Sequence, residues 1–173
     1  MIVIKDKRNC VGCSACEQVC PKHCISMKSD KEGFVYPVVD VTHCVDCKLC
    51  EKVCPVINTV QMSNRIESTL GCFIKDDKLR ERSSSGGFFS ALSQYVLRRG
   101  GLVFGAKFNE RWEVIHGAID NEEGLYLLRG SKYVQSSMGT VFSQVKEELK
   151  GGRLVLFTGT PCQVKGLLLF LGK

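Results

Sequence analysis

The sequence predicts an α+β protein in two unlike parts, a small N-terminal part organised by cysteine loops and a larger α/β part with a mixed sheet. A pattern of four cysteines and a proline occurs twice between Cys10 and Pro55. Residues 58–69 then lose both the cysteines and the apolar pattern, which is typical of a linker. Beyond them, strand-like and helix-like segments alternate, which favours a sheet covered by helices. We therefore expect one domain over residues 1–62 and a second over residues 63–173.

The duplicated pattern has the spacing Cys-x2-Cys-x2-Cys-x3-Cys-Pro, and its two copies start at Cys10 and Cys44. Three thiolates spaced in this way can wrap one iron-sulfur cube, while the fourth, launched from a short helix that Pro21 or Pro55 ends, reaches the other cube. The spacing therefore predicts two 4Fe-4S clusters with crossed ligation. The predicted ligands are Cys10, Cys13, Cys16 and Cys54 for the first cluster, and Cys44, Cys47, Cys50 and Cys20 for the second.

Two other uses of the cysteines are less favoured. Zinc ribbons also contain Cys-x2-Cys pairs, but they have no use for the third Cys-x2 step or the Cys-Pro tail. Disulfides would require an exported chain. Because eight ligands are already complete, we expect Cys24 to pack beside a cluster rather than bind it. Between the two copies, a turn and an extended stretch are predicted to place Phe34 and Tyr36 over the cluster region.

Charge and composition limit the partners of the chain. The formal net charge is +6, and two oxidised clusters with eight thiolates would contribute roughly −4 to it. The basic excess lies in residues 63–173 and could attract an anionic cofactor or an acidic redox partner, although a solvated lysine-rich surface explains it equally well. No basic tract interleaved with aromatic residues favours nucleic acid. We expect no membrane span and a cytoplasmic, reducing location, such as that of an anaerobe.

Apolar periodicity predicts the remaining elements. In the first part, short strands are expected over residues 2–5 and 25–27. In the second, strands are expected over residues 71–74, 102–106, 114–118 and 154–157, and helices over residues 87–99, 140–150 and 161–171. The inward side chains of the first two helices are predicted to be Phe88, Leu92, Tyr95 and Val96, and Val141, Phe142, Val145 and Leu149.

Two loops of the second part have compositions that suit an anionic ligand. The segment 82–87 opens a helix with serines and glycines, and the exposed N–H groups of a helix N-terminus are a natural seat for phosphate. A serine N-cap with glycines for close packing is an equally good explanation. In segment 130–136, Lys132 is flanked by serine and Tyr133 and could clamp an anionic or carbonyl group. By itself, that segment is better explained as a surface strand.

The third loop, residues 158–163, follows an apolar strand directly. Thr160 is the expected N-cap and Pro161 the first helical residue, so Cys162 falls in the first turn, where the helix dipole favours a thiolate. That position suits a redox-active thiol, a cluster ligand or a flavin contact. A small buried cysteine at a strand-to-helix turn is the alternative. His23 and His116 are expected to be ordinary structural or surface histidines.

Together these motifs resemble a known family. In order, the two cysteine repeats, Asp-Lys-Glu-Gly-Phe-Val-Tyr-Pro, Ser-Ser-Ser-Gly-Gly-Phe-Phe, Gly-Ser-Lys-Tyr-Val-Gln-Ser and Gly-Thr-Pro-Cys-Gln closely resemble the coenzyme F420 hydrogenase/dehydrogenase beta-subunit family. The bacterial branch with an N-terminal two-cluster ferredoxin domain is the nearest match, and the resemblance runs the whole length of the chain. It implies a flavoprotein that passes electrons between a reduced deazaflavin or related donor, FAD and two 4Fe-4S clusters.

The resemblance also assigns residues to the flavin site. The serine-glycine loop would approach the flavin phosphates through Ser84, Ser85, Gly86 and Gly87. Lys132 and Tyr133 would line the flavin or substrate pocket. Thr160 and Cys162 would face the redox centre, with Cys162 and Lys132 as the catalytic candidates.

The resemblance also bears on completeness and partners. Family members usually continue well past Gly-Thr-Pro-Cys-Gln, so we expect the second domain to be incomplete. A fragment, a truncated gene product and a half that pairs with another chain are the three alternatives for this chain. The expected partners are a redox protein or subunit and a chain that supplies the remaining C-terminal part. A ferredoxin-type electron carrier or docking module without catalysis of its own is the alternative function.

Overall fold

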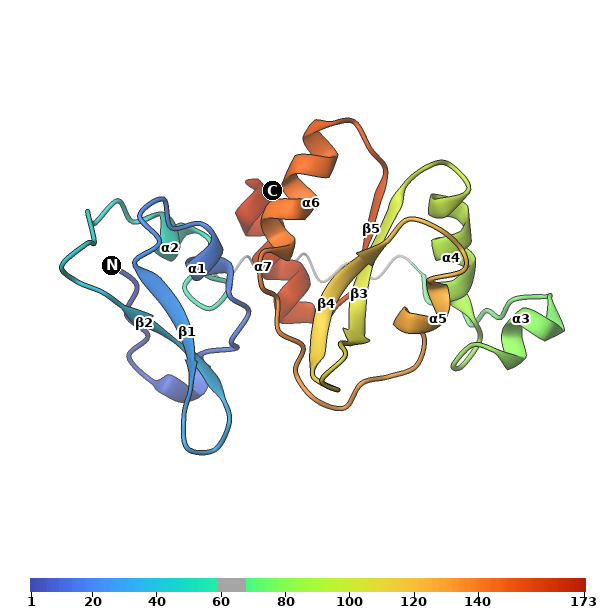
Figure 1. Ribbon diagram of the computed structural model, residues 1–173, viewed down its shortest axis with the longest axis horizontal. Helices are drawn as coiled ribbons and strands as arrows, with labels where there is room; N and C mark the ends of the chain where they lie inside the picture. Colours follow the sequence, from blue (N-terminus) through green and yellow to red (C-terminus); the bar gives the residue numbers. More distant parts are fainter. Residues whose placement is uncertain (59–67) are drawn as a thin grey trace. The chain divides into compact units, whose positions relative to one another are not determined.

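A computed structural model of the protein describes residues 1–58 and 68–173 (Figure 1). The chain divides into two compact units. One comprises Met1–Gln61, Met138–Ser143 and Gly159–Lys173, and the other comprises Met62–Ser137 and Gln144–Thr158. The predicted boundary at residues 62 and 63, and most of the predicted linker, lie outside the described residues. The first unit thus includes two segments that lie far beyond the cysteine repeats in the sequence.

The first unit is built around a hairpin and short helices (Figure 1). Its elements are the 3-10 helix η1 (Lys7–Asn9), α1 (Ala15–Gln18), β1 (Ile25–Ser29), β2 (Val35–Val39), α2 (Leu49–Lys52) and α7 (Pro161–Leu171). Strands β1 and β2 pair antiparallel, with Ile25 opposite Val39. The strand predicted over residues 2–5 is not formed, because Ile2 and Ile4 pack among the cysteine side chains and not against a sheet edge.

The second unit contains a three-stranded mixed sheet, as the sequence predicts. Its elements are α3 (Asp77–Glu81), α4 (Phe88–Leu97), β3 (Leu102–Phe108), β4 (Val114–Ile119), α5 (Leu125–Leu128) and β5 (Val155–Phe157). The strand order is β4-β3-β5, with β3 antiparallel to β4 and parallel to β5. Helix α6 (Val141–Lys150) begins in the first unit and ends in the second.

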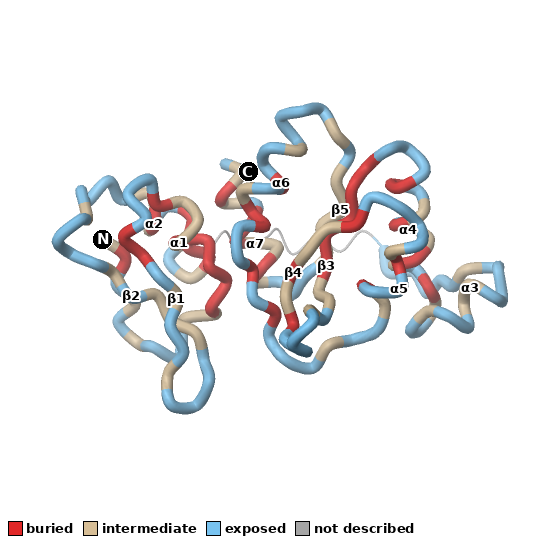
Figure 2. The backbone as a smooth tube through the Cα atoms, viewed as in Figure 1, coloured by how far each residue is buried: buried red, intermediate tan, exposed pale blue. Residues whose placement is uncertain are grey.

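The central strand β3 carries much of the core of the second unit. Val103 and Phe104 are 0% and 1% exposed, and residues 102–105, the first four of β3, are all buried (Figure 2). On one face of the sheet, Val103 and Ile119 pack with Val96 of α4 and Leu125 of α5. Two helices therefore cover this face and bury its apolar side chains from water.

Helix α4 forms where it was predicted, but the predicted inward face is wrong for three of its four residues. Phe88, Leu92 and Tyr95 are 59%, 38% and 54% exposed, and only Val96 of the predicted set is buried. The buried face carries Ser90 and Ser93 instead. The hydroxyl of Ser90 bonds to Ser83 and Arg129, which satisfies a polar group that burial would otherwise penalise.

The strand predicted over residues 71–74 is also absent. Gly71, Cys72 and Phe73 are exposed and form no strand. The backbone instead contacts the serine-glycine loop, where Ile74 N donates to Gly86 O at 2.8 Å. A Cβ atom on Gly86 would lie 2.5 Å from Cys72 O, so a glycine is needed for this close approach.

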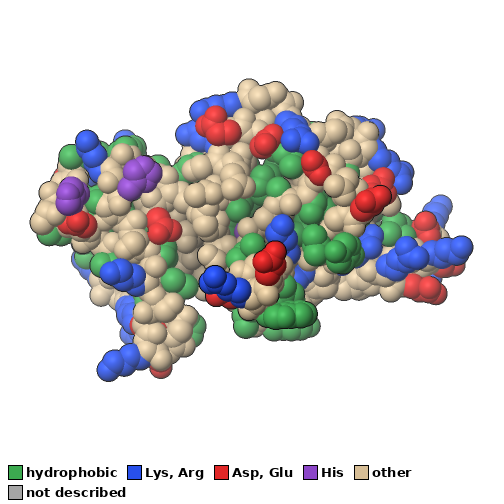
Figure 3. Space-filling model, viewed as in Figure 1, with side chains coloured by type: hydrophobic (Ala, Val, Ile, Leu, Met, Phe, Trp, Pro, Cys, Tyr) green, Lys and Arg blue, Asp and Glu red, His purple; other side chains and the backbone are tan. Residues whose placement is uncertain are grey.

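The outer parts of the second unit leave several apolar side chains accessible to solvent. Leu149, predicted to face inward on α6, is 44% exposed, whereas Val145 is 1% exposed. Figure 3 shows apolar side chains gathered at the end of the β3–β4 hairpin, where Phe108 and Trp112 place their ring centroids 5.7 Å apart. Within the described residues, no helix is both long and apolar enough to span a membrane.

The packing of β3 makes a direct prediction about stability. Replacing the 1% exposed Phe104 by alanine should lower the free energy of unfolding by about 3–5 kcal/mol, because it removes a fully buried ring and leaves a cavity. Phe108→Ala is the matched control on the same strand, since Phe108 is 46% exposed. Urea unfolding followed by circular dichroism measures both. Equal losses in the two variants would contradict the burial pattern.

Candidate metal centres

The two cysteine repeats have equivalent backbone conformations. In the first loop, Gly12 and Ser14 have φ angles of 58° and 60°. Asp46 and Lys48 occupy the same positions of the second loop and have φ angles of 47° and 63°. Helices α1 and α2 each begin at the next residue and contain a single turn. The duplicated sequence has therefore produced a duplicated loop and helix.

The residues with positive φ angles explain how each loop can wrap around a cofactor. They flank Cys13 in the first loop and Cys47 in the second, so the chain turns sharply around the middle cysteine. Turns of this kind direct successive backbone N–H groups inward and form concavities that suit anionic groups, including iron-sulfur clusters. Ser14 and Lys48 are not glycines, and each costs about 1–2 kcal/mol in this conformation. Strain of this kind is concentrated at binding sites.

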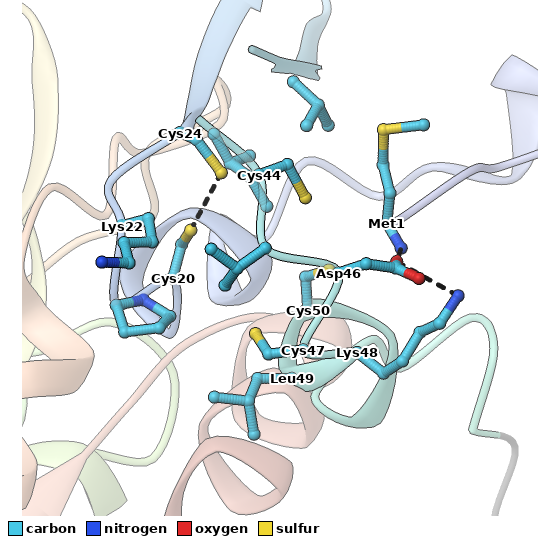
Figure 4. Close-up of a pocket in the computed structure, with 14 residues that line it drawn as sticks. Met1, Cys20, Lys22, Cys24, Cys44, Asp46, Cys47, Lys48, Leu49 and Cys50 are labelled. Carbon is cyan, nitrogen blue, oxygen red and sulfur yellow. Dashed lines mark hydrogen bonds and ion pairs between the residues drawn. The ribbon is translucent and has the colours of Figure 1, made fainter. Parts of the chain in front are cut away.

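Each predicted set of four cysteines lines one cavity. The first cavity is lined by the sulfur-bearing residues Cys10, Cys13, Cys16 and Cys54, with Ile2, Ile4, Met27, Pro37 and Val56 among its apolar walls. The second is lined by Cys20, Cys44, Cys47 and Cys50, together with Cys24 (Figure 4). In both cavities, three cysteines come from one repeat and the fourth from the other. The grouping agrees with crossed ligation.

The residues of both cavities fit 4Fe-4S clusters. Each cavity is lined by its four predicted thiols and by mostly apolar residues, and Cys24 adds a fifth thiol to the second cavity. In the described part of the chain, no group of three or more Cys, His, Asp or Glu side chains is arranged to hold a single metal ion. A 4Fe-4S cluster instead takes one thiolate at each of its four irons.

Burial keeps the thiols of the first cavity protonated when no cluster is bound. Burial, together with the charges of the neighbouring cysteines, raises the pKa of Cys13 to about 11 and that of Cys16 to about 12. Burial also raises the pKa of Cys10. Backbone N–H groups that point at these sulfurs act in the opposite direction. Because iron binds thiolates, loading a cluster here must release protons.

Cys20 has a different environment. Burial acts to raise its pKa, but hydrogen bonds from the backbone and thiol of Cys24 and from the backbone of Lys22 and His23 outweigh it and lower the pKa. The Cys20 and Cys24 sulfurs lie 3.4 Å apart (Figure 4). The hydrogen bond to Cys20, followed by burial, raises the pKa of Cys24 to about 11. Cys24 is 8% exposed, so it packs beside the second cavity.

Helix α7 packs directly against the first cavity, which the sequence did not reveal. A Cβ atom on Gly166 would lie 3.2 Å from Cys13 Sγ. Gln18 of α1 accepts a hydrogen bond from Phe142 N at 2.9 Å, and the Phe142 and Phe170 ring centroids lie 5.9 Å apart. A glycine inside an otherwise apolar helix is the signal that could have indicated this close approach.

The loop before α7 has the predicted geometry. Thr160 is the N-cap and Pro161 the first helical residue, so Cys162 lies in the first turn. Gln163 Oε1 accepts a hydrogen bond from Thr160 N at 2.9 Å, and Thr160 Oγ1 lies 3.1 Å from Cys162 Sγ. Cys162 also contributes electrostatically to the raised pKa of Cys13. Cys162 and Thr160 therefore belong to the unit that contains both cysteine sets.

His116 is a structural histidine, and it connects two of the predicted loops. Its side chain is 6% exposed. Nε2 donates to Thr158 O at 2.9 Å, which leaves Nδ1 to accept from Ser136 Oγ at 2.7 Å. Burial lowers the pKa of His116, so the neutral form with this tautomer is favoured. His23 is exposed.

Some residues assigned by resemblance have other contacts in the structure. Lys132 Nζ donates to the carbonyl oxygens of Leu127 and Arg129 at 3.2 and 2.8 Å, which caps the end of α5. Tyr133 is 95% exposed. The expectation that Phe34 and Tyr36 cover the clusters is wrong, because neither residue lines either cavity. Phe34 is 56% exposed, and Tyr36 packs under Lys7.

The serine-glycine loop belongs to the second unit. Ser84 and Ser85 are exposed, and Gly87 is the N-cap of α4 with a φ of 78°. A Cβ atom on Gly87 would lie 2.7 Å from Ile74 Cγ2, and Gly86 approaches Cys72 as described above. Both glycines therefore serve close packing, and the exposed serines leave a polar surface beside them.

The duplicated loops, crossed cysteine sets and β1–β2 hairpin together define the N-terminal part as a ferredoxin-type iron-sulfur domain. Residues 9–58 match the family described as the 4Fe-4S dicluster domain. No curated protein matches the chain. A 4Fe-4S domain of this type supports an electron-carrier role, because each cluster accepts and donates one electron at a time.

The crossed grouping predicts which variants lose the same cluster. Anaerobically reconstituted protein should hold about eight irons per chain, and Cys10→Ala and Cys54→Ala should each retain about four, because both remove a ligand of the same cluster. Iron analysis and the spectrum of the reduced cluster measure this. Cys72→Ala is the matched control, since Cys72 is an exposed cysteine. A Cys54→Ala spectrum that matches Cys44→Ala and differs from Cys10→Ala would contradict crossed ligation.

The contact between α7 and the first cavity makes a second prediction. Gly166→Val should displace Cys13 and weaken the first cluster while leaving the second in place, because the new side chain meets Cys13 Sγ. Helix propensity alone would not cause this loss, since glycine is the poorer helix former. Leu168→Ala, at a position that is 46% exposed on the same helix, should keep both clusters. Unchanged iron content in Gly166→Val would show that the contact is dispensable.

Proposed function

We propose that the chain is an iron-sulfur flavin oxidoreductase, or a subunit of one, that moves electrons between a reduced donor, FAD and two 4Fe-4S clusters. The first cluster would be held by Cys10, Cys13, Cys16 and Cys54, and the second by Cys20, Cys44, Cys47 and Cys50. The observation that carries the proposal is helix α7. Its first turn holds Cys162 within the Gly-Thr-Pro-Cys-Gln segment, and its middle packs on Cys13.

The position of Cys162 on α7 supports the proposed electron transfer between FAD and the first cluster. Cys162 lies about one helical turn before Gly166, and Gly166 contacts a proposed ligand of the first cluster. A redox group held at Thr160 and Cys162 would therefore lie close to that cluster. FAD, when bound, accepts two electrons together and releases them singly to one-electron carriers. The donor would be a deazaflavin such as coenzyme F420, or another two-electron donor.

Positively charged residues in the second unit support the proposed binding of the FAD phosphates. Arg82 and Arg129 line one open pocket, and burial together with the charge of Arg82 lowers the pKa of Arg129. Arg129 also donates to Ser90 Oγ at 3.1 Å, and Ser90 contacts Ser83. Two neighbouring guanidinium groups suit phosphate oxygens, and Arg82 precedes the exposed Ser84 by two residues in the chain. Glu122 and Glu123 line the same pocket, and Arg98 and Gln94 bind the carboxylate of Glu122.

A specific observation favours the alternative, an electron carrier without catalysis of its own. The amine of Lys132 is occupied by two backbone carbonyl groups, and Tyr133 is 95% exposed. Neither side chain is held against a pocket by these contacts. In that alternative, the second unit binds a redox partner protein or a further chain, and the clusters perform the whole reaction.

Flavin binding decides between the two functions. Purified or FAD-supplemented protein should retain FAD after gel filtration, and it should reduce a dye with a deazaflavin or nicotinamide donor. Cys162→Ala should lose flavin or activity while keeping about eight irons, because Cys162 is not one of the proposed ligands. The matched control is Cys72→Ala, which should keep both. Intact clusters with no flavin after FAD addition would reject the oxidoreductase proposal and support the electron carrier.

A further inference from the structure

The two cysteine sets are equivalent in their ligands but not in their surroundings. Cys24 lies beside the second set without being one of the proposed ligands. It is 8% exposed, and its sulfur lies 3.4 Å from Cys20 Sγ in the second cavity (Figure 4). Once Cys20 binds iron as a thiolate, its sulfur can only accept a hydrogen bond. The remaining donor between the two sulfurs is then the S–H group of Cys24.

The internal duplication provides a direct comparison for this position. Asn58 follows Cys54 at the same spacing as Cys24 follows Cys20, and it does not take the same role. Its side-chain Nδ2 donates to the carbonyl oxygens of Glu51, Lys52 and Cys54 at 2.6, 3.0 and 3.2 Å. Asn58 is not among the residues that line the first cavity. The first cysteine set therefore has no counterpart of the Cys24 thiol at the equivalent position.

The charged residues that line the two cavities also differ. The second cavity is lined by Lys22 and Lys48 and by one carboxylate, Asp46. Lys48 Nζ lies 3.2 Å from Asp46 Oδ1, and the N-terminal amine of Met1, which also lines this cavity, pairs with Asp46 and Glu51. The described residues that line the first cavity include no lysine, arginine, aspartate or glutamate. The second cavity therefore has the more electropositive surroundings.

We propose that Cys24 is a positioning residue that donates a hydrogen bond to the Cys20 sulfur and raises the reduction potential of the second cluster above that of the first. Reduction adds negative charge to a cluster, and hydrogen bonds to its sulfurs stabilise that charge. Electrons delivered to the first cluster, against which α7 packs, then pass downhill to the second. This inference rests on the proposed ligand sets and does not depend on FAD.

The test is an anaerobic redox titration of the loaded protein followed by electron paramagnetic resonance. Cys10→Ala and Cys44→Ala, which each retain one cluster, assign the two midpoint potentials. In Cys24→Ala, the reduction equilibrium constant of the second cluster should fall about tenfold. For a one-electron couple, this lowers the midpoint potential by about 59 mV. The potential of the first cluster and the iron content should not change. Asn58→Ala is the matched control, and it should leave both potentials unchanged.

Three outcomes would overturn the proposal. They are two unchanged potentials in Cys24→Ala, an equal shift of both, and a native protein in which the second cluster has the lower potential. If Cys24→Ala loses iron, Cys24→Val decides the question, because valine fills a similar space but has no group that donates a hydrogen bond. Full iron content with a lowered second potential alone in Cys24→Val supports the hydrogen bond, and any other result rejects it. Iron content tests the proposed ligand sets, and the potentials test the role of Cys24. A failure of the ligand sets can therefore be distinguished from a failure of the hydrogen-bond proposal.

Discussion

The structure of the first unit depends on the convergence of four sulfur atoms from two separate segments of the chain at each cavity. Neither repeat can complete a set of four by itself, because its fourth cysteine lines the cavity of the other repeat. The two loops must therefore fold together. This mutual dependence also explains why so small a unit has an interior made largely of cysteine, with Ile2 and Ile25 as its apolar members. Bound clusters would supply much of the stability that a core of this size lacks.

The contact between α7 and Cys13 extends this constraint beyond the cysteine repeats. Residues 159–173 and 138–143 belong to the same compact unit as the cysteine loops, although they lie far beyond the second repeat in the sequence. A glycine at position 166 allows the helix to approach the sulfur. The same helix begins with Cys162 in its first turn. The iron-sulfur part of the molecule and the Gly-Thr-Pro-Cys-Gln segment therefore belong to one structural unit.

The second unit shows where apolar periodicity is an incomplete guide. Strand β3 is buried as its unbroken apolar run predicts, and α4 and α7 begin within a residue of their expected positions. The buried face of α4 could not be predicted from apolar periodicity. Ser90 is buried through hydrogen bonds to Ser83, in the loop before the helix, and to Arg129, which is distant in the sequence. Residues 71–74 have the composition of a strand, but among the described residues no strand pairs with them, and their backbone bonds to the loop at Gly86. Strand formation requires a partner, which a local pattern cannot supply.

By itself, the sequence determined the type of cofactor, because cluster ligation needs fixed residue types at fixed spacings, and it predicted the cysteines that would hold the two clusters and their crossed grouping. It also predicted the ends of α4, α6 and α7 to within two residues, through local signals such as Thr160-Pro161 at the start of α7. Only the tertiary structure decided that Gly166 lies against Cys13, that His116 joins Ser136 to Thr158, and that Cys24 lies beside Cys20 while Asn58 turns to the backbone. These are contacts between side chains or segments whose distances depend on the packing of whole elements, and no local spacing encodes them.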